Sequence, residues 1–213
     1  MKKIILMAVS VIFITNTVFS QILIEDNRGK MQFGIKGGLN YSNVYDAEGE
    51  EFDADAKFGY AFGANLNIPI GNFLGVQPSV MVSQKGFQAS GSLLNNNYNF
   101  TRTTTFLDVP LLLAIKPINA LTILAGPQFS YLLKQRDEFN NSANSAAQEQ
   151  EFKNDNIRKN IFGGVIGFDV NFNHFTIGAR ANWDIQTNNG DGTSSTPRYK
   201  NAWYQLTLGY NLF

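Results

Sequence analysis

Apolar and polar side chains alternate with a period of two along most of the chain after residue 30. Between residues 104 and 117, the odd positions from 107 to 115 are all aliphatic, while the even positions include Asp108 and Lys116. Successive side chains of a β-strand point to opposite faces, so this pattern predicts strands with one apolar face and one polar face. No stretch beyond residue 30 has the roughly 18 consecutive apolar residues that a membrane-spanning helix needs. The chain is therefore predicted to be all-β.

The alternation predicts eight strands separated by connections of two lengths. The strands are expected at residues 31–45, 57–69, 73–87, 104–117, 121–135, 157–172, 175–187 and 199–213. The long connections are 46–56, 88–97, 136–156 and 188–198, and the short ones are 70–72, 117–119 and 173–174. Bacterial transmembrane barrels combine an even strand number with long loops at one end and short turns at the other. We therefore predict an eight-stranded antiparallel transmembrane β-barrel with long extracellular loops, short periplasmic turns and both termini at the turn end.

The size of the side chains separates a membrane barrel from a soluble one, because both kinds have one apolar face. Here the polar face is rich in Gly, Ala, Ser, Asn and Gln, which suits a narrow eight-stranded interior. The other face carries the large side chains, with aromatic residues near both strand ends, as in the interfacial belts of a membrane protein. They are Phe33, Phe73, Phe172 and Phe175 towards the turns, and Tyr41, Phe58, Tyr60, Tyr131, Phe162, Trp183 and Tyr204 towards the loops. We expect Leu107, Val109, Leu111 and Leu113 to face lipid and Asp108 to face the interior.

The N-terminus has the pattern of a secretory signal peptide. Residues 1–3 include two lysines, residues 4–19 are mostly apolar, and a small-residue cleavage site ends at Ser20, before Gln21. The alternative is an N-terminal membrane anchor, but the apolar run is short and holds Ser10, Thr15 and Asn16. We predict a signal peptide at 1–20, an N-terminal periplasmic segment at 21–30 and the barrel at 31–213. Because the chain has no cysteine, disulfides and a lipid anchor on cysteine are excluded.

Several charged residues fall on the polar face and are therefore expected inside the barrel. They are Lys36, Lys85, Asp108, Lys116, Asp169, Arg180 and Asp184. We interpret this set as a structural lumen network of paired charges, with a proton or small-ion path as the alternative. Arg180 is expected to pair with Asp169 or Asp184. Asp169 lies on the neighbouring hairpin strand, close enough in register for a diagonal pair.

Two local features modify the regular strand pattern. Pro78, Pro110 and Pro127 fall in mid-strand, although proline is normally confined to strand edges and bulges. Since a closed barrel has no edge, we predict a bulge at each proline. In the longest loop, residues 142–152 could form one or two helical turns, but we expect this segment to be mobile.

Motifs for catalysis, metal binding and nucleic-acid binding are weak. His174, the single histidine, lies in a two-residue connection with no serine nucleophile and acid beside it, which argues against a hydrolase triad. The acidic residues between Asp46 and Asp55 do not match the spacing of a calcium loop, and the glycines of 163–167 lie inside a strand with no helix following. With 17 basic and 17 acidic residues, the chain lacks the net positive charge of a nucleic-acid-binding protein. We predict no catalytic residue, metal site or cofactor.

Three motifs resemble the PorT-like outer-membrane β-barrel family. They are QPSVMVSQKG at 77–86, FLDVPLLL at 106–113 and AGPQFSYLL at 125–133, and the likeness, with its glycine-rich first strand and terminal Phe213, spans about residues 31–213. This chain departs from the pattern at Asp108, where glutamate is expected, and at Ser79, where an acid is common. The resemblance implies an outer-membrane location. For most members it implies no settled activity, and a few relatives are linked to protein secretion.

These observations predict an integral protein of the Gram-negative outer membrane without catalytic activity. A structural, adhesive or envelope-complex role is expected, with a small outer-membrane enzyme or a ligand- or ion-binding barrel as the alternative. The expected partners are outer-membrane lipid and lipopolysaccharide, the barrel-assembly machinery during biogenesis, and envelope proteins that contact the extracellular loops. The loop end should carry any recognition surface, because loops on a rigid scaffold are the usual place for binding residues. No nucleic-acid partner is expected.

Overall fold

The computed structural model describes residues 26–48, 54–93, 96–141, 144–150, 158–188 and 198–212. The predicted signal peptide 1–20 and residues 21–25 of the N-terminal segment lie outside the described residues, as do 49–53 of the acidic stretch. The strands are β1 (Gln32–Glu48), β2 (Ala54–Pro69), β3 (Leu74–Leu93), β4 (Asn96–Ile118), β5 (Leu121–Asn141), β6 (Asn144–Gln150), β7 (Asn160–Phe172), β8 (Phe175–Asp184) and β9 (Arg198–Asn211). Within these ranges no helix is long and apolar enough to cross a membrane.

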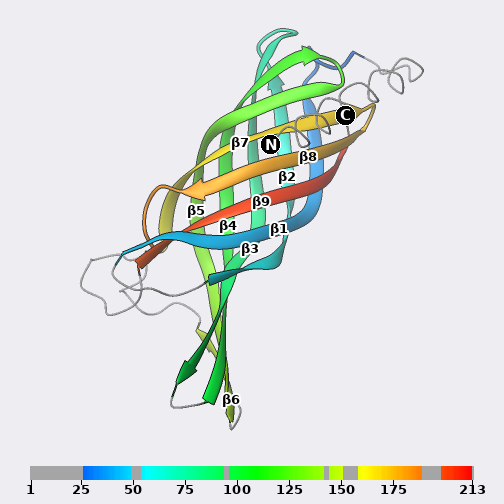
Figure 1. The fold of residues 1–213 in the computed structure, drawn as a ribbon. Helices are drawn as coiled ribbons and strands as arrows, with labels where there is room; N and C mark the ends of the chain where they lie inside the picture. The colour runs from blue at the N-terminus through cyan, green and yellow to red at the C-terminus, as the bar shows by residue number, and fades with distance from the viewer. Residues whose placement is uncertain are drawn as a thin grey trace, which may run out of the picture.

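Eight of the strands form a closed antiparallel barrel (Figure 1). Neighbours follow the order β4-β3-β2-β1-β9-β8-β7-β5, and pairing between β4 and β5 closes the ring. Short turns join β2 to β3, β4 to β5 and β7 to β8 at one end, which we call the turn end. Gly71 and Asn173 in two of these turns have positive φ angles of 117° and 51°, as tight hairpin connections require. The prediction of an eight-stranded antiparallel barrel is confirmed.

The loop end, opposite the turns, contains more strand than the sequence pattern predicts. β3 continues to Leu93 and β4 begins at Asn96, so most of the predicted loop 88–97 is paired backbone. Residues 144–150 of the segment 142–152 do not form the helical turns that the sequence allows; they form β6 and pair with residues 135–141 of β5. Strand pairing depends on backbone hydrogen bonds, so these polar segments can extend the barrel's hairpins without apolar alternation.

The extended ends form a ribbon of four strands that projects beyond the barrel, at the bottom of Figure 1. We call it the β-finger and define it by residues 88–93, 96–101, 136–141 and 144–150. Its strand β6 pairs only with β5 among the described residues. One side of β6 therefore presents unpaired backbone groups within the described part of the chain.

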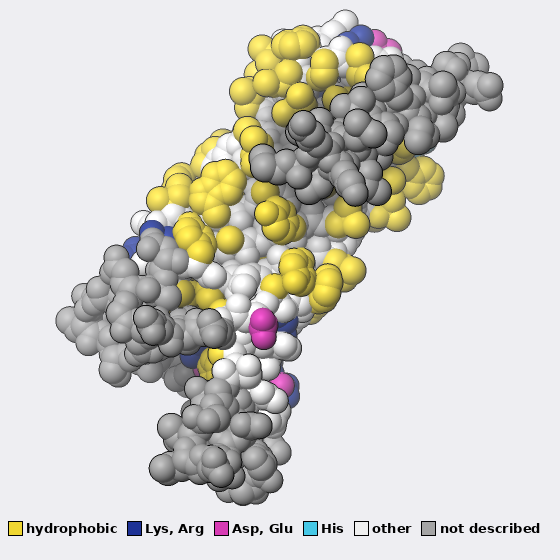
Figure 2. All heavy atoms as spheres, in the orientation of Figure 1, with side chains coloured by type: hydrophobic (Ala, Val, Ile, Leu, Met, Phe, Trp, Pro, Cys, Tyr) yellow, Lys and Arg dark blue, Asp and Glu magenta, His cyan; other side chains and the backbone are white. Residues whose placement is uncertain are grey.

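The large apolar side chains lie on the outside of the barrel, and they cover much of the face seen in Figure 2. Leu111 of β4 is 52% exposed, whereas its neighbour Leu112 is 0% exposed and contacts Leu124 and Val165 inside the barrel. Leu107, Val109 and Leu113 share the outer face with Leu111, while Asp108 points inward. A lipid-immersed barrel has this arrangement, and a water-soluble barrel has the reverse.

The three prolines do not produce bulges, so that prediction is wrong. Pro110 faces Gln128 and Leu113 faces Ala125 in one unchanged register, and the ladders beside the other two prolines also keep their register. A proline removes one N–H donor without adding a residue, so the ladder continues past it. The register instead shifts elsewhere, for example where β4 residues 105–106 meet β5 residues 132–134. There Leu133 and Lys134 both face outward, and the alternation is broken.

Candidate functional site in the barrel lumen

The polar face of the strands lines the lumen, and all seven charged residues predicted for it are buried. These residues are Lys36, Lys85, Asp108, Lys116, Asp169, Arg180 and Asp184. Four of them form two ion pairs, and the other three have no ion-pair partner among the described residues. The lumen therefore contains two ion pairs together with three charged residues that have no ion-pair partner among the described residues.

The first ion pair joins Lys85 of β3 to Asp108 of β4. Lys85 Nζ lies 3.0 Å from Asp108 Oδ1, and the hydroxyl of Ser130 on β5 donates to the same oxygen at 2.6 Å. The ammonium also lies 4.5 Å from the ring centre of Phe106 and 3.7 Å from that of Trp203. A carboxylate and two aromatic rings thus surround one cation, an arrangement that compensates for its removal from water.

This pair is built from the three motifs quoted above. Lys85 lies in the motif at 77–86, Asp108 lies in 106–113, and Ser130 lies in 125–133. The strands that carry them, β3, β4 and β5, are consecutive neighbours, and Asp108 faces Ser130 directly across the sheet. The motifs that mark the family resemblance therefore supply one buried polar cluster.

Asp184 of β8 has no cation in contact and is held by neutral donors. Asn201 of β9 donates to its carboxylate from the backbone N–H at 3.2 Å and from the side-chain amide. The positive charge of Lys85 favours the ionised form of the Asp184 carboxyl, and the negative charge of Asp108 disfavours it. Lys85 is therefore paired with Asp108 and acts on Asp184 only through space.

The second ion pair joins Arg180 of β8 to Asp169 of β7. Arg180 Nη2 lies 3.0 Å and 3.2 Å from the two carboxylate oxygens, and Nη1 donates to Thr207 at 3.2 Å. Gln77 bridges the pair, because its Oε1 accepts from Arg180 and its amide donates to Asp169. A Cβ at Gly178 would come within 2.5 Å of Asp169 Oδ1, so glycine leaves the space that the pair occupies. Arg180 thus pairs with Asp169 and not with Asp184.

Of the three lumen lysines, Lys36 and Lys116 have no ion pair among the described residues. Lys36 of β1 is 8% exposed, and its side chain makes no hydrogen bond or ion pair with the described residues. The charges that act on it are those of Arg180 and Asp169. Lys116 of β4 donates to the backbone carbonyl of Arg28 at 3.0 Å. One lysine is therefore satisfied by the N-terminal segment, and the other is buried without a partner among the described residues.

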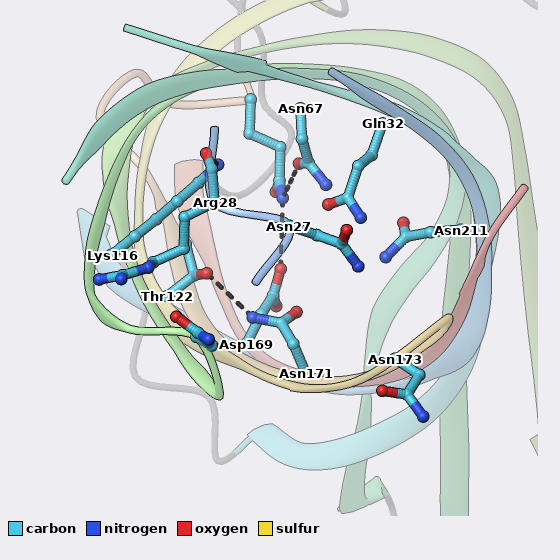
Figure 3. A pocket seen from close by; sticks show the side chains of 12 residues that line it. Asn27, Arg28, Gln32, Asn67, Lys116, Thr122, Asp169, Asn171, Asn173 and Asn211 are labelled. Atoms are coloured by element: carbon cyan, nitrogen blue, oxygen red, sulfur yellow. Dashed lines mark hydrogen bonds between the residues drawn. The ribbon is translucent and has the colours of Figure 1, made fainter. Parts of the chain in front are cut away.

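The N-terminal segment enters the turn end of the barrel (Figure 3). Asn27 and Arg28 line a polar cavity of about 30 Å³ there, together with Lys116 and Asp169. The other lining residues are Gln32, Asn67, Gln77, Asn119, Thr122, Asn171, Asn173 and Asn211. Outside the strands, Arg28 donates to Asp26 and holds the pKa of that carboxyl below its ordinary value. The sequence pattern did not reveal this contact, because residues 26–30 have no periodicity to place them.

A third charged cluster, at the loop end, was missed by the sequence analysis. Arg102 of β4 binds Asp137 of β5 through two hydrogen bonds of 2.8 Å, and its Nη1 donates to Tyr199 at 3.4 Å. Tyr199 in turn makes an edge contact with Phe87. Arg102 has the same even parity as Thr104 and Asp108, so extending the alternation beyond the predicted start of the strand would have identified it.

His174 does not take part in a catalytic arrangement among the described residues. Its Nδ1 lies 3.0 Å from the backbone oxygen of Asn211, and its ring stacks on Tyr210 at 5.7 Å. In the described part of the chain, no group of three or more His, Asp or Glu side chains is placed to hold a metal ion. The geometry therefore supports fixed charges in a narrow lumen and, in the described part of the chain, places no serine or acid beside His174.

The sequence profile of the outer membrane protein beta-barrel domain family matches residues 19–187 of the chain. No curated protein matches the chain. The family match covers β1 to β8, which include all seven lumen residues described above.

The chain is also similar to several solved structures. Ail, the attachment invasion locus protein of Yersinia pestis, was solved in complex with the heparin analogue sucrose octasulfate; it is 16% identical over 85% of this chain and 99% of its own, with a TM-score of 0.48. Neisserial surface protein A is 8% identical over 84% of this chain and 96% of its own, with a TM-score of 0.46. The outer membrane protein OprG from Pseudomonas aeruginosa is 15% identical over 85% and 95%, with a TM-score of 0.36.

Proposed function

The chain belongs to the outer membrane protein beta-barrel domain family, and from this premise we propose that it is a non-catalytic adhesive barrel of the Gram-negative outer membrane. In this proposal the barrel is a rigid base, and the β-finger binds a protein partner outside the cell. The observation that supports it is the projection of paired backbone beyond a barrel whose lumen is filled. The function of such a protein would depend on binding at its loop end and not on transport of a solute through its lumen.

The filled lumen argues against transport as the main activity. An eight-stranded barrel is only wide enough for its own side chains. Here the interior holds large residues as well as ion pairs, including Phe106, Leu132 and Ile161 in one cluster and Leu112 and Leu124 in another. At the turn end the polar cavity measures about 30 Å³, enough for a very few water molecules. No solute larger than a small ion fits this interior.

The exposed side of β6 supports a protein partner. A strand that pairs on one side only offers its remaining N–H and C=O groups to an extended segment of another chain, which can add to the sheet. Among the described residues, β6 pairs with β5 alone. Polar side chains dominate its sequence, NSAAQEQ, which is consistent with a strand that stays in water until a partner binds.

Location and processing complete the proposal. Residues 1–20 would be removed on export, and residues 21–30 would remain at the periplasmic side, where Asn27 and Arg28 line the turn-end cavity. Outer-membrane lipid and lipopolysaccharide would surround the apolar belt, and the assembly machinery would insert the barrel. Within the family, membership of the PorT-like group rests on the motifs at 77–86, 106–113 and 125–133.

Shortening the β-finger should abolish adhesion without unfolding the barrel. In the variant, residues 140–152 are replaced by a short Gly-Ser linker, which removes β6 but keeps the Arg102–Asp137 pair. Bacteria that produce the intact chain should bind extracellular-matrix proteins or epithelial monolayers, and the shortened variant should lose that binding. A matched control shortens residues 189–197, at the same end of the barrel. Equal binding by the shortened variant and the intact chain would contradict the proposal.

The purified barrel should show no porin-like conductance. Its lumen contains buried side chains along most of its length, so planar-bilayer recordings should give at most brief, small-ion currents. Substituting Arg102 by alanine, which removes a bulky side chain at the loop-end mouth, should not open a pore, because the clusters around Phe106 and Leu112 remain. Stable conductance of porin size from the wild-type monomer would refute the assignment of a filled lumen.

A further inference from the structure

Lys36 is a buried lysine to which the described residues give no partner. Its side chain is 8% exposed and makes no hydrogen bond or ion pair with them. Taking an ammonium group out of water is costly unless an opposite charge or hydrogen-bond acceptors replace its hydration. Burial and the lack of a partner together indicate that a molecule or ion from outside the chain contacts Lys36. We propose that the turn-end half of the lumen binds a small monovalent anion, such as chloride, beside Lys36.

The balance of charge around Lys36 favours an anion. Arg180 is the neighbouring cation, and Asp169 is the neighbouring carboxylate. Asp169 is already engaged by Arg180 at 3.0 Å and 3.2 Å and by Gln77 at 3.3 Å. With Lys36 protonated, these three charges sum to one positive charge, and because Arg180 binds the carboxylate directly, the ammonium of Lys36 is the less compensated of the two cations.

The outer part of the same end adds a second positive charge. Lys116 and Arg28 line the cavity at the turn end, and the acid that binds Arg28 is the exposed Asp26. Lys116 bonds only a neutral carbonyl, that of Arg28. Negative charge is in excess elsewhere, around Lys85, where two carboxylates share one lysine. An anion that enters from the turn end therefore meets a positive potential that ends at the middle of the barrel.

Size and hydrogen-bond donors restrict the ligand class. Lys36 lines a pocket of about 10 Å³ that shares Asn67, Gln77, Asp169 and Asn211 with the larger turn-end cavity. A space of this size is at the lower limit for one water molecule, so a halide requires a small outward shift of the surrounding side chains, and phosphate esters or organic acids are excluded. Asparagine and threonine side chains line it together with Arg180 and the carboxylate of Asp169, and the N–H and O–H groups among them can donate to an anion.

Halide titrations of the full-length purified barrel in detergent test the proposal. Bromide is exchanged for gluconate at constant ionic strength, and the thermal midpoint of unfolding is followed. The midpoint should rise and then saturate with bromide, because a ligand that binds only the folded state stabilises it. In Lys36→Met the midpoint should not depend on bromide. This variant should still fold, since it removes a buried charge without breaking a hydrogen bond to any described residue.

Lys159→Met is the matched control, because it makes the same charge change near the loop end and should keep the bromide response. Crystals soaked in bromide give an independent measurement, with an anomalous peak expected within hydrogen-bonding distance of Lys36 Nζ. A wild-type midpoint that is unchanged by bromide, or a Lys36→Met variant that responds like wild type, would overturn the proposal and indicate that water alone solvates Lys36. Neither result depends on adhesion, so failure here is distinct from failure of the proposed function.

Discussion

Replacing Lys85 by methionine should destabilise the barrel by about 3–5 kcal/mol, the cost of leaving a buried charge without its partner. Methionine keeps most of the length of the side chain, so packing between Phe106 and Trp203 changes little and the loss of charge dominates. In the variant, Asp108 retains Ser130 and Asp184 retains Asn201, but neither carboxylate has a cation in the middle of the lumen. Urea unfolding of the barrel in lipid vesicles, followed by tryptophan fluorescence, measures the loss.

Asp108→Asn should cost clearly less than Lys85→Met. The negative charge of Asp184 and the two aromatic rings would still stabilise the Lys85 ammonium. The asparagine side chain can also still accept a hydrogen bond from Ser130. The double variant Lys85→Met/Asp108→Asn should recover part of the loss, because only Asp184 then lacks a cation. Equal losses for the two single variants would mean that Lys85 acts on Asp108 alone, contrary to the shared-cation arrangement.

The inward position of the charged residues was predictable, because side-chain parity in a strand is a local property. Each of the seven lies on the polar face in the sequence pattern, and each is buried in the structure. The diagonal contact between Asp169 and Arg180 could also be predicted from the sequence. The two-residue turn at 173–174 sets the β7–β8 register, which places Gly167 opposite Arg180 and Asp169 opposite Gly178.

Contacts that depend on strand extensions were not predictable in the same way. Lys85 and Asp108 lie on a hairpin whose ends run into polar sequence up to Leu93 and Asn96, where alternation no longer marks a strand. The sequence pattern did not predict the β-finger for this reason. Its strands continue the backbone pairing of the barrel strands, and they do not need alternating apolar and polar side chains. The proline prediction failed because a missing donor interrupts a ladder without forcing an extra residue into it.

The partner of Asp184 could not be deduced from parity. The sequence offered Asp169 and Asp184 as acids on the polar face for Arg180, and Asp184 is bonded to Asn201 of β9, a residue with no charge to attract attention. The surroundings of Lys36 also could not be deduced from side-chain parity. Its inward position follows from alternation, but its lack of a partner follows from the full set of side chains around it.

At the second ion pair the order of effects should be reversed, because there one carboxylate serves two cations. Asp169→Asn leaves Arg180 and Lys36 without an acid and should cost about 3–5 kcal/mol. Arg180→Met should cost less, since the charge of Lys36 already acts with that of Asp169 and would remain.

Measuring both variants in gluconate buffer removes any contribution from a bound halide. The double variant Asp169→Asn/Lys36→Met should then be more stable than Asp169→Asn alone, because only Arg180 would be left without an acid. If Arg180→Met proves the more damaging substitution, Lys36 does not share Asp169. The opposite asymmetries at Lys85 and Asp169 have one cause: in each half of the lumen a single residue of one sign faces two of the other, and losing that residue leaves two buried charges uncompensated.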